Sequence, residues 1–224
     1  MSRNAPLKPF SAIVFDMDGT LLDTELVFKE IVWDVSRELG VAMTDAVHHA
    51  MVGASHEASN KLLVEAYGVS FPTALFDEKC RVQMRARMEL AVPVKTGVHE
   101  LLAELKARRI PTAVATSSRS NHALGHLNAA GLLSTFVTVV TRDDVVNPKP
   151  HPEPYLMAAE RIGIAPVDCL AIEDSHMGVR AAHAAGLQTI MVPDIVAPTD
   201  EIRGLCAAVM DSLHDVRKAA FASA

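Results

Sequence analysis

Short apolar runs alternate with helical patterns over most of the chain, and this alternation predicts an α/β fold. The first run, Ala12–Phe15, is apolar throughout, as in a strand buried on both faces. Further apolar runs predict strands at Thr112–Ala115, Phe136–Val140, Cys169–Ile172, Gln188–Val192 and Ala207–Met210. Helical patterns lie between them at Val98–Arg109, Ser120–Ala130, Glu153–Ile162 and Ser175–Ala185. Alternating strands and helices predict a Rossmann-like, doubly wound parallel sheet with right-handed crossovers.

The stretch from residue 24 to residue 93 has a different pattern, which is helical and contains no convincing buried strand. Its first helix has one apolar stripe before a glycine at a C-cap position, made of Val27, Ile31, Val32, Val35 and Leu39 ahead of Gly40. Further helices are expected at Thr44–Met51, Glu57–Tyr67 and Leu75–Leu90. We therefore expect an inserted α-helical cap domain at 24–93, and an α/β catalytic core made of 1–23 and 94–224.

Composition limits the class of protein. The chain has 224 residues, of which 50% are hydrophobic and 21% charged, so a well-filled core is expected. The net charge of −6 argues against nucleic-acid binding. Cys80, Cys169 and Cys206 are odd in number and far apart, which fits free thiols in a reducing cytoplasm. Because no signal peptide or apolar run of ~18 residues is present, we expect a cytoplasmic protein without membrane contact. The compact domain and small cap make a monomer the default expectation.

The most informative segment follows the first predicted strand and reads Asp16-Met17-Asp18-Gly19-Thr20. In open α/β sheets, ligands bind beyond the carboxyl ends of the strands, where Asp16 and Asp18 are expected. Two carboxylates held close together repel each other, and a divalent cation relieves that repulsion. Gly19 lets the backbone turn sharply and approach a ligand. Taken alone, the segment is equally well explained as an Asp-rich turn.

Three further predicted strands are followed by polar residues that suit phosphate chemistry. Thr116 and Ser117 offer a hydroxyl and the N–H groups of a helix start. Lys149 lies between two prolines, on a stiff segment that aims its ammonium group. Glu173 and Asp174 form a second acidic pair. Helix capping or a solvated loop explains each in isolation, but together they supply the groups that hold magnesium and offset the charge of a phosphoryl group.

These four motifs, in this order, resemble those of the haloacid dehalogenase superfamily of phosphotransferases. The resemblance covers essentially the whole chain, and the segment Met177–Ala182 is similar to the family's usual continuation after the second acidic pair. The helical insert is similar to the small cap of the β-phosphoglucomutase-like subgroup. The resemblance therefore implies the same core fold, with a helical cap, and an enzyme that acts on phosphate esters.

The resemblance also implies roles for the four acidic residues. Asp16 would be the nucleophile that forms an aspartyl-phosphate, and Asp18 would be the general acid and then the general base. Mg²⁺ would be held by the Asp16 carboxylate, the main-chain carbonyl of Asp18 and Asp174. Glu173 would act on the metal through water.

The phosphate-binding residues implied by the resemblance come from three of the motifs. Thr116 and the Ser117 N–H would hold phosphoryl oxygens, next to the backbone turn at Gly19. Lys149 would offset the charge on Asp16 and on the transferring group. Thr116 and Lys149 are therefore expected to take part in catalysis together with the two aspartates of the first motif.

We expect a phosphatase rather than a phosphohexomutase. The mutase subgroup carries a cap histidine where this chain has Phe28 and a cap arginine where it has His56, so Gly53 and His56 are the candidate substrate contacts of the cap. The β-phosphoglucomutase-like mutase is the alternative, and a phospho-receiver signalling domain is a distant one. The segments Thr116–Ser120 and Met191–Asp194 are similar to those of members acting on sugar phosphates or on pseudouridine monophosphate. Nucleotides and glycolate-like acids stay open as substrates.

Overall fold

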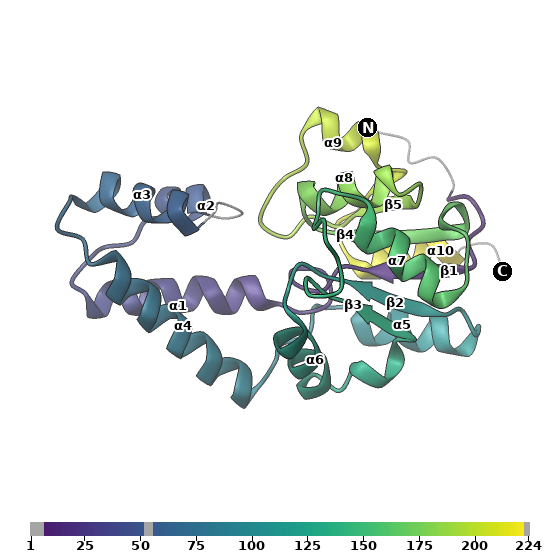
Figure 1. Ribbon diagram of the computed structural model, residues 1–224, viewed down its shortest axis with the longest axis horizontal. Helices are drawn as coiled ribbons and strands as arrows, with labels where there is room; N and C mark the ends of the chain where they lie inside the picture. Colours follow the sequence, from purple (N-terminus) through teal and green to yellow (C-terminus); the bar gives the residue numbers. More distant parts are fainter. Residues whose placement is uncertain (1–6, 52–55, 222–224) are drawn as a thin grey trace. The chain divides into compact units, whose positions relative to one another are not determined.

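The computed structural model describes residues 7–51 and 56–221, and the chain divides into two compact units (Figure 1). One unit consists of Met1–Asp23 together with Pro93–Ala224, and the other of Thr24–Val92. Each unit has its own apolar core and is described by itself. That the second unit acts as a cap stays a prediction.

The first unit is built on a six-stranded sheet in which every neighbouring pair is parallel. Its strands are β1 (Ala12–Phe15), β2 (Thr112–Ala115), β3 (Thr138–Val140), β4 (Cys169–Glu173), β5 (Gln188–Met191) and β6 (Ala208–Val209). Their order is β3-β2-β1-β4-β5-β6. Val14 in the centre pairs with Ala113 on one side and with Ala171 on the other. The predicted Rossmann-like α/β fold is therefore confirmed.

Helices cover both faces of this sheet, as Figure 1 shows for α7 and α8 on one side and α5 on the other. The helices of the unit are α5 (Val98–Ala107), α6 (Ser120–Ala129), α7 (Glu153–Ile162), α8 (His176–Ala184), α9 (Asp200–Leu205) and α10 (Leu213–Phe221), with short 3₁₀ turns at Leu133–Thr135 and Pro166–Asp168. Because strand side chains alternate between faces, Val14 and Ala171 point to the face where Tyr155 of α7 and Ala181 of α8 are buried.

The strand order places one crevice at the centre of the sheet. The chain runs outward from β1 to β3, and then returns to β4 on the other side of β1. The connections on either side of β1 therefore lead in opposite directions, and ligands bind at such a switch point beyond the carboxyl ends of the strands. Asp16 follows β1 directly, and Asp174 follows β4.

The second unit is helical among its described residues, as the sequence predicts. Its helices are α1 (Thr24–Glu38), α2 (Asp45–Met51), α3 (His56–Tyr67) and α4 (Thr73–Leu90). The predicted stripe of α1 supplies three buried core residues, Ile31, Val32 and Val35. Gly40 ends this helix with a φ of 73°, which a glycine adopts without strain. Over the described residues of both units, no helix is long and apolar enough to cross a membrane.

Two helices of the first unit, α9 and α10, were not predicted, although capping signals precede both. The Thr199 hydroxyl accepts a hydrogen bond from the Ile202 N–H at 3.3 Å at the start of α9. Ser212 accepts from the Asp215 N–H at 3.2 Å at the start of α10. Helix α5 ends at Ala107, two residues earlier than predicted, because Arg109 turns the chain with a φ of 58°. The other predicted boundaries agree with the observed ones to within two residues.

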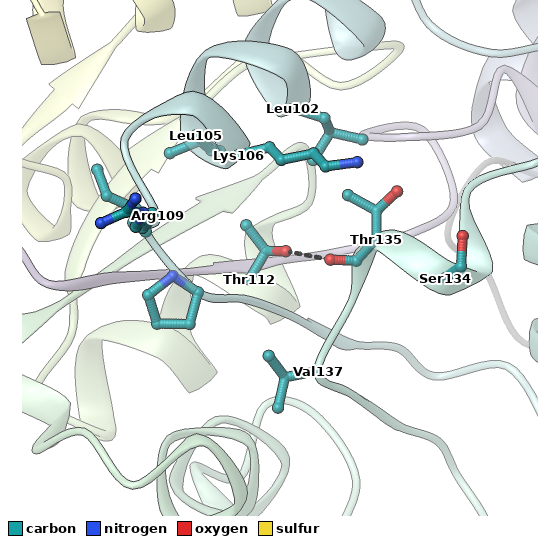
Figure 2. A pocket seen from close by; sticks show the side chains of 10 residues that line it. Leu102, Leu105, Lys106, Arg109, Thr112, Ser134, Thr135 and Val137 are labelled. Carbon is teal, nitrogen blue, oxygen red and sulfur yellow. Dashed lines mark hydrogen bonds between the residues drawn. The ribbon is translucent and has the colours of Figure 1, made fainter.

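A hollow of about 320 Å³ opens at the amino end of β2 (Figure 2). It is lined by Leu102, Leu105, Lys106, Arg109, Ile110, Pro111, Thr112, Ser134, Thr135 and Val137. Thr112, the first residue of β2, donates a hydrogen bond to the Thr135 carbonyl there at 3.0 Å. The hollow lies at the opposite end of β2 from Thr116, so it is separate from the crevice at the carboxyl edge.

The two segments that lead into and out of the helical unit are tied together. The Asp23 N–H donates to the Pro93 carbonyl, and the Lys95 N–H donates to the Leu21 carbonyl, both at 2.9 Å. The Lys95 ammonium contacts Asp194 at 2.7 Å and Asp23 at 3.5 Å. Burial alone would lower the pKa of Lys95, but the two carboxylates outweigh it and raise that pKa. This lysine therefore joins both crossings to the segment after β5.

Replacing Lys95 by Met should lower the free energy of unfolding by about 1–3 kcal/mol, because a partly buried carboxylate of Asp194 loses its charged partner. Lys61→Met is the matched control, since its contact with Glu65 is 3.8 Å long and exposed. Urea unfolding of the three proteins measures the difference. Equal stability of the two variants would show that the Lys95 contacts contribute nothing measurable.

Candidate active site

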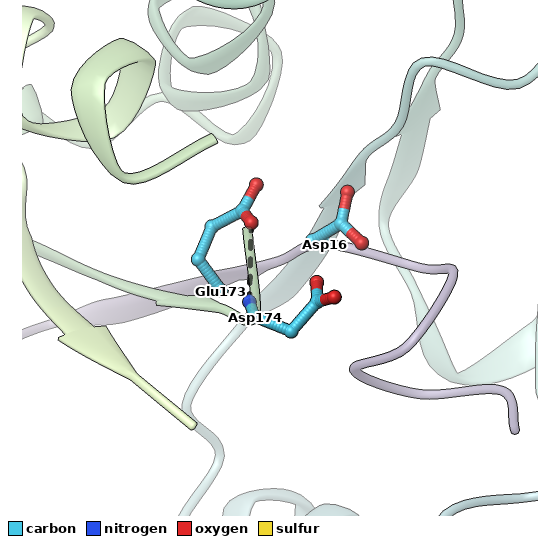
Figure 3. Close-up of side chains that lie close together, drawn as sticks. All are labelled: Asp16, Glu173 and Asp174. Carbon is cyan, nitrogen blue, oxygen red and sulfur yellow. Dashed lines mark hydrogen bonds between the residues drawn. The ribbon is translucent and has the colours of Figure 1, made fainter. Parts of the chain in front are cut away.

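Three carboxylates gather at the carboxyl ends of β1 and β4 (Figure 3). Asp16 is only 7% exposed, and its N–H donates to the Ile172 carbonyl of β4 at 2.9 Å. Oxygen atoms of Asp16, Glu173 and Asp174 lie within 4.8 Å of one another. The parallel register of the two strands explains this, because Phe15 lies opposite Ile172 and the next residues of both strands are acidic. This cluster is the only such group of possible metal ligands among the described residues.

Lys149 is the cation of this cluster. Its ammonium contacts Asp16 Oδ1 and Glu173 Oε1, each at 2.5 Å, and its side chain is only 4% exposed. The nitrogen also lies 5.0 Å from the centre of the Tyr155 ring, within range of a cation–π interaction. The structure therefore brings the lysine of the third predicted motif into contact with the first and the fourth.

Glu173 is a fully buried carboxylate whose two oxygens are both used. Oε1 accepts from Lys149 and from the Tyr155 hydroxyl at 2.7 Å. Oε2 accepts from the Asp174 N–H at 3.1 Å, the Ser175 N–H at 3.1 Å and the Ser175 hydroxyl at 3.0 Å. Such a carboxylate holds other groups in place: it fixes Lys149 and the turn that carries Asp174. The water-mediated metal contact expected of Glu173 stays a prediction.

Two glycines make room for the carboxylates. A Cβ on Gly178 would overlap the Glu173 carboxylate, and one on Gly19 would overlap Oδ2 of Asp174. Gly19 also has a φ of 82°, which strains any other residue. The Thr20 hydroxyl donates to Asp174 Oδ1 at 3.1 Å. The first motif thus positions the second acidic pair by direct contact.

The loop after β2 faces the same site. Thr116 is buried, and its hydroxyl oxygen accepts from the Ser118 N–H at 3.0 Å. That bond uses a lone pair of the Thr116 hydroxyl oxygen and leaves the hydroxyl proton available to another acceptor. The Ser118 hydroxyl donates to Asp18 Oδ2 at 2.7 Å. Ser117 is exposed.

The cluster has an excess of buried negative charge. Burial raises the pKa of Asp16 from 3.8 to about 8, with additions from Glu173 and Asp18 and opposition from Lys149. Burial also raises the pKa of Asp174 well above its usual range, with Asp16 and Glu173 adding to it. If all three carboxyl groups were ionised, they would exceed the one ammonium group of Lys149 by two negative charges. The donor set therefore fits a hard divalent cation, which would balance this charge.

The structure brings most of the predicted residues together in the first unit. Contacts link the first motif, Lys149 and the second acidic pair, and the Ser118 contact joins the loop of Thr116 to Asp18. Of the expected cap residues, Gly53 lies outside the described residues. His56 is the first residue of α3, and its side chain is likewise outside them. Phe28 is partly buried and packs against the apolar core of the helical unit.

Three residues that matter for this geometry were not singled out as site residues: Tyr155, Gly178 and Ser118. Gly178 has a signal in the sequence, because a glycine inside a helical pattern suggests a close approach by another group. Tyr155 and Ser118 have none, because their partners lie 18 and 100 residues away and the pairing depends on how helices and loops pack.

Comparison with known proteins assigns the family. Residues 13–192 match the family model described as haloacid dehalogenase-like hydrolase. The chain is 33% identical over 179 residues to a phosphorylated carbohydrates phosphatase of Thermotoga maritima, covering 80% of this chain and 83% of the relative. It is 34% identical over 200 residues to a Drosophila melanogaster protein named as probable pseudouridine-5'-phosphatase, covering 85% of each.

A solved structure agrees with this assignment. A Thermotoga maritima protein described as a candidate β-phosphoglucomutase superposes with a TM-score of 0.78 at 28% identity, covering 94% of this chain and 96% of that one. The chain belongs to the haloacid dehalogenase-like hydrolases, in the β-phosphoglucomutase-like subgroup. It is a phosphoric monoester hydrolase.

Gly178→Ala and Gly125→Ala form a matched pair of substitutions in helix interiors. Gly125 of α6 has open space around it, so alanine should stabilise by about 0.5–1 kcal/mol. Alanine at 178 should destabilise by about 1–3 kcal/mol, because it displaces the Glu173 carboxylate. Thermal or urea unfolding measures both, and stabilisation of the protein by Gly178→Ala would contradict the described contact.

The affinity for Mg²⁺ should rise with pH between pH 6 and pH 8. In the metal-free protein burial raises the pKa of Asp16 to about 8 and that of Asp174 well above its usual range, so a bound cation must displace protons from these carboxyl groups. Each displaced proton corresponds to about a tenfold change in Kd for each pH unit. Calorimetric titration between pH 6 and 9 measures the Kd, and the Asp16→Asn variant is the control in which the dependence on pH should be less steep. The same Kd at pH 6 and pH 8 would refute this coupling.

Proposed function

We propose that this protein is a Mg²⁺-dependent phosphatase that hydrolyses a small phosphorylated metabolite through an aspartyl-phosphate on Asp16. The observation that carries the proposal is the buried Lys149 ammonium between Asp16 and Glu173, with Asp174 beside them. A nucleophilic carboxylate must approach a dianionic phosphate ester, so its site needs fixed positive charge. Lys149 supplies one such charge, and a divalent cation would supply the rest.

The Asp16 carboxylate, Asp174 and the main-chain carbonyl of Asp18 would hold the cation. When bound, it would neutralise charge on the carboxylates and on the phosphoryl oxygens. Glu173 would keep Lys149 and the turn of Asp174 in position. One of its oxygens accepts from Lys149 and Tyr155, and the other accepts from Asp174 and Ser175.

In the first step, a carboxylate oxygen of Asp16 attacks phosphorus in line with the ester oxygen. The bond between phosphorus and the ester oxygen breaks, its electron pair stays on that oxygen, and Asp18 donates a proton to it. The Thr116 hydroxyl and the Ser117 N–H bind the phosphoryl oxygens during this transfer. The alcohol then leaves.

In the second step, Asp18 accepts a proton from water, whose oxygen attacks phosphorus. The bond between phosphorus and Asp16 breaks, which releases inorganic phosphate and returns both aspartates to their starting states. One water molecule is consumed for each ester hydrolysed. The same residue therefore serves as acid and then as base.

We propose a sugar phosphate, or a nucleotide or pseudouridine monophosphate, as the substrate. The support is the likeness to relatives named for phosphorylated carbohydrates and pseudouridine 5'-phosphate. The helical unit 24–92 is proposed to act as the cap that selects the alcohol part. Phe28 has an apolar packing role there, which favours hydrolysis over the mutase alternative.

Asp16→Asn should lower Mg²⁺-dependent release of phosphate from p-nitrophenyl phosphate by more than about 10³-fold, because an amide is not a nucleophile for this reaction. Asp211→Asn, an exposed aspartate of the same unit, is the control and should keep the native rate. A colorimetric assay at saturating Mg²⁺ measures both. Full activity of Asp16→Asn would refute the nucleophile assignment.

A screen of phosphorylated metabolites, with kcat/KM for each, tests the proposed substrate class. We expect the highest value for a sugar phosphate or a pseudouridine or nucleotide monophosphate. Incubation of the native protein with β-glucose 1-phosphate and its bisphosphate tests the mutase alternative. Efficient isomerisation without net release of phosphate would overturn the hydrolase proposal.

A further inference from the structure

Ser118 makes a direct side-chain contact with the proposed general acid. Its hydroxyl donates a hydrogen bond to Asp18 Oδ2 at 2.7 Å, although the two residues are 100 positions apart in the chain. Both belong to the first unit, so the contact does not depend on where the helical unit lies. A distance of 2.7 Å is the usual length of a hydrogen bond between a hydroxyl donor and an oxygen acceptor.

Ser118 is itself fixed by its backbone. Its N–H donates to the Thr116 hydroxyl oxygen at 3.0 Å, and its carbonyl accepts from the Arg142 N–H at 2.9 Å. Thr116 is in turn anchored through its own N–H, which donates to the Val140 carbonyl at 2.9 Å. The backbone of Ser118 is therefore held through both its N–H and its carbonyl, which fixes the point from which its hydroxyl reaches Asp18.

We propose that Ser118 is a positioning residue that fixes the carboxyl group of Asp18 and assigns different tasks to its two oxygens. This rests on the proposed function. Oδ2 accepts the Ser118 hydrogen bond as the carbonyl-type oxygen, so Oδ1 is the oxygen that carries the transferable proton. That proton moves to the ester oxygen as the bond to phosphorus breaks, and the bonding electron pair stays on the ester oxygen.

This role has a consequence for the choice of leaving group. An alcohol leaves as a strongly basic alkoxide unless it is protonated, whereas p-nitrophenolate is stabilised and needs little help from an acid. A misplaced Asp18 therefore slows the release of basic leaving groups more than that of p-nitrophenolate. By holding Asp18, Ser118 makes the site suited to esters of ordinary alcohols, which include sugars and nucleosides.

The test compares Ser118→Ala with the native protein on p-nitrophenyl phosphate and phenyl phosphate. Phenol has a pKa of about 10, as the tyrosine side chain does, so it is much the more basic leaving group. The parameter to measure is kcat/KM, because it covers the steps up to departure of the leaving group and excludes hydrolysis of the aspartyl-phosphate. We expect a loss of about 10-fold or more for phenyl phosphate and under about threefold for p-nitrophenyl phosphate.

Three controls keep the result interpretable. Ser118→Thr retains the hydroxyl and should restore the ratio of the two kcat/KM values, which a packing defect alone would not do. Ser134→Ala removes an exposed hydroxyl near the opposite end of β2 and should change neither value. Thermal unfolding of each variant with Mg²⁺ checks that the fold is intact, and if Ser118→Ala does not fold, Ser118→Cys replaces it.

Equal losses on both substrates, or no loss on phenyl phosphate, would overturn the role of Ser118. Failure of the proposed function would look different, because the native protein would then release no phosphate from either ester with Mg²⁺, or Asp16→Asn would remain active. The two hypotheses therefore fail by separate measurements.

Discussion

The carboxyl edge of the sheet depends on one buried charge, the ammonium group of Lys149. A buried ammonium costs several kcal/mol unless opposite charges compensate it, and Asp16 and Glu173 do so at 2.5 Å each. The site holds more carboxyl groups than Lys149 needs as partners, because Asp174 adds a third. Burial raises the pKa of Asp16 to about 8 even though Lys149 opposes that rise. The carboxylates that stabilise Lys149 would thus also suit a divalent cation, and the lysine and the proposed metal would together balance the negative charge of the site.

The strand order brings these charged residues together. Lys149 and Asp16 are 133 residues apart, and Ser118 and Asp18 are 100 apart, yet each pair is in contact. Parallel strands end at one edge, and the reversal of direction beside β1 leaves a crevice there. Loop closure costs only about 0.6 kcal/mol more for each doubling of loop length, so an inserted unit between β1 and β2 adds little cost to assembling the edge.

The sequence could predict the parts of the site that follow from strand periodicity. β1 and β2 have the predicted bounds, and the polar residues after β1, β2 and β4 lie at the predicted edge. The pairing of side chains could not be predicted, because it depends on the packing of loops and helices: Tyr155 reaches Glu173 only because α7 packs on the same face as α8. The starts of α9 and α10 were readable from Thr199 and Ser212, whose capping patterns are local.

Glycine in the middle of α8 shows how the site limits the stability of the fold. A helix interior with Gly is less stable than one with Ala by about 0.5–1 kcal/mol, yet a Cβ on Gly178 would overlap the Glu173 carboxylate. Gly19 makes the same kind of room for Asp174. The space beside these two glycines is filled by carboxylates, and the mutual repulsion of the carboxylates opposes folding. A cation that binds only the folded arrangement offsets that repulsion by mass action. The metal proposed for the chemistry would therefore stabilise the fold of the same edge.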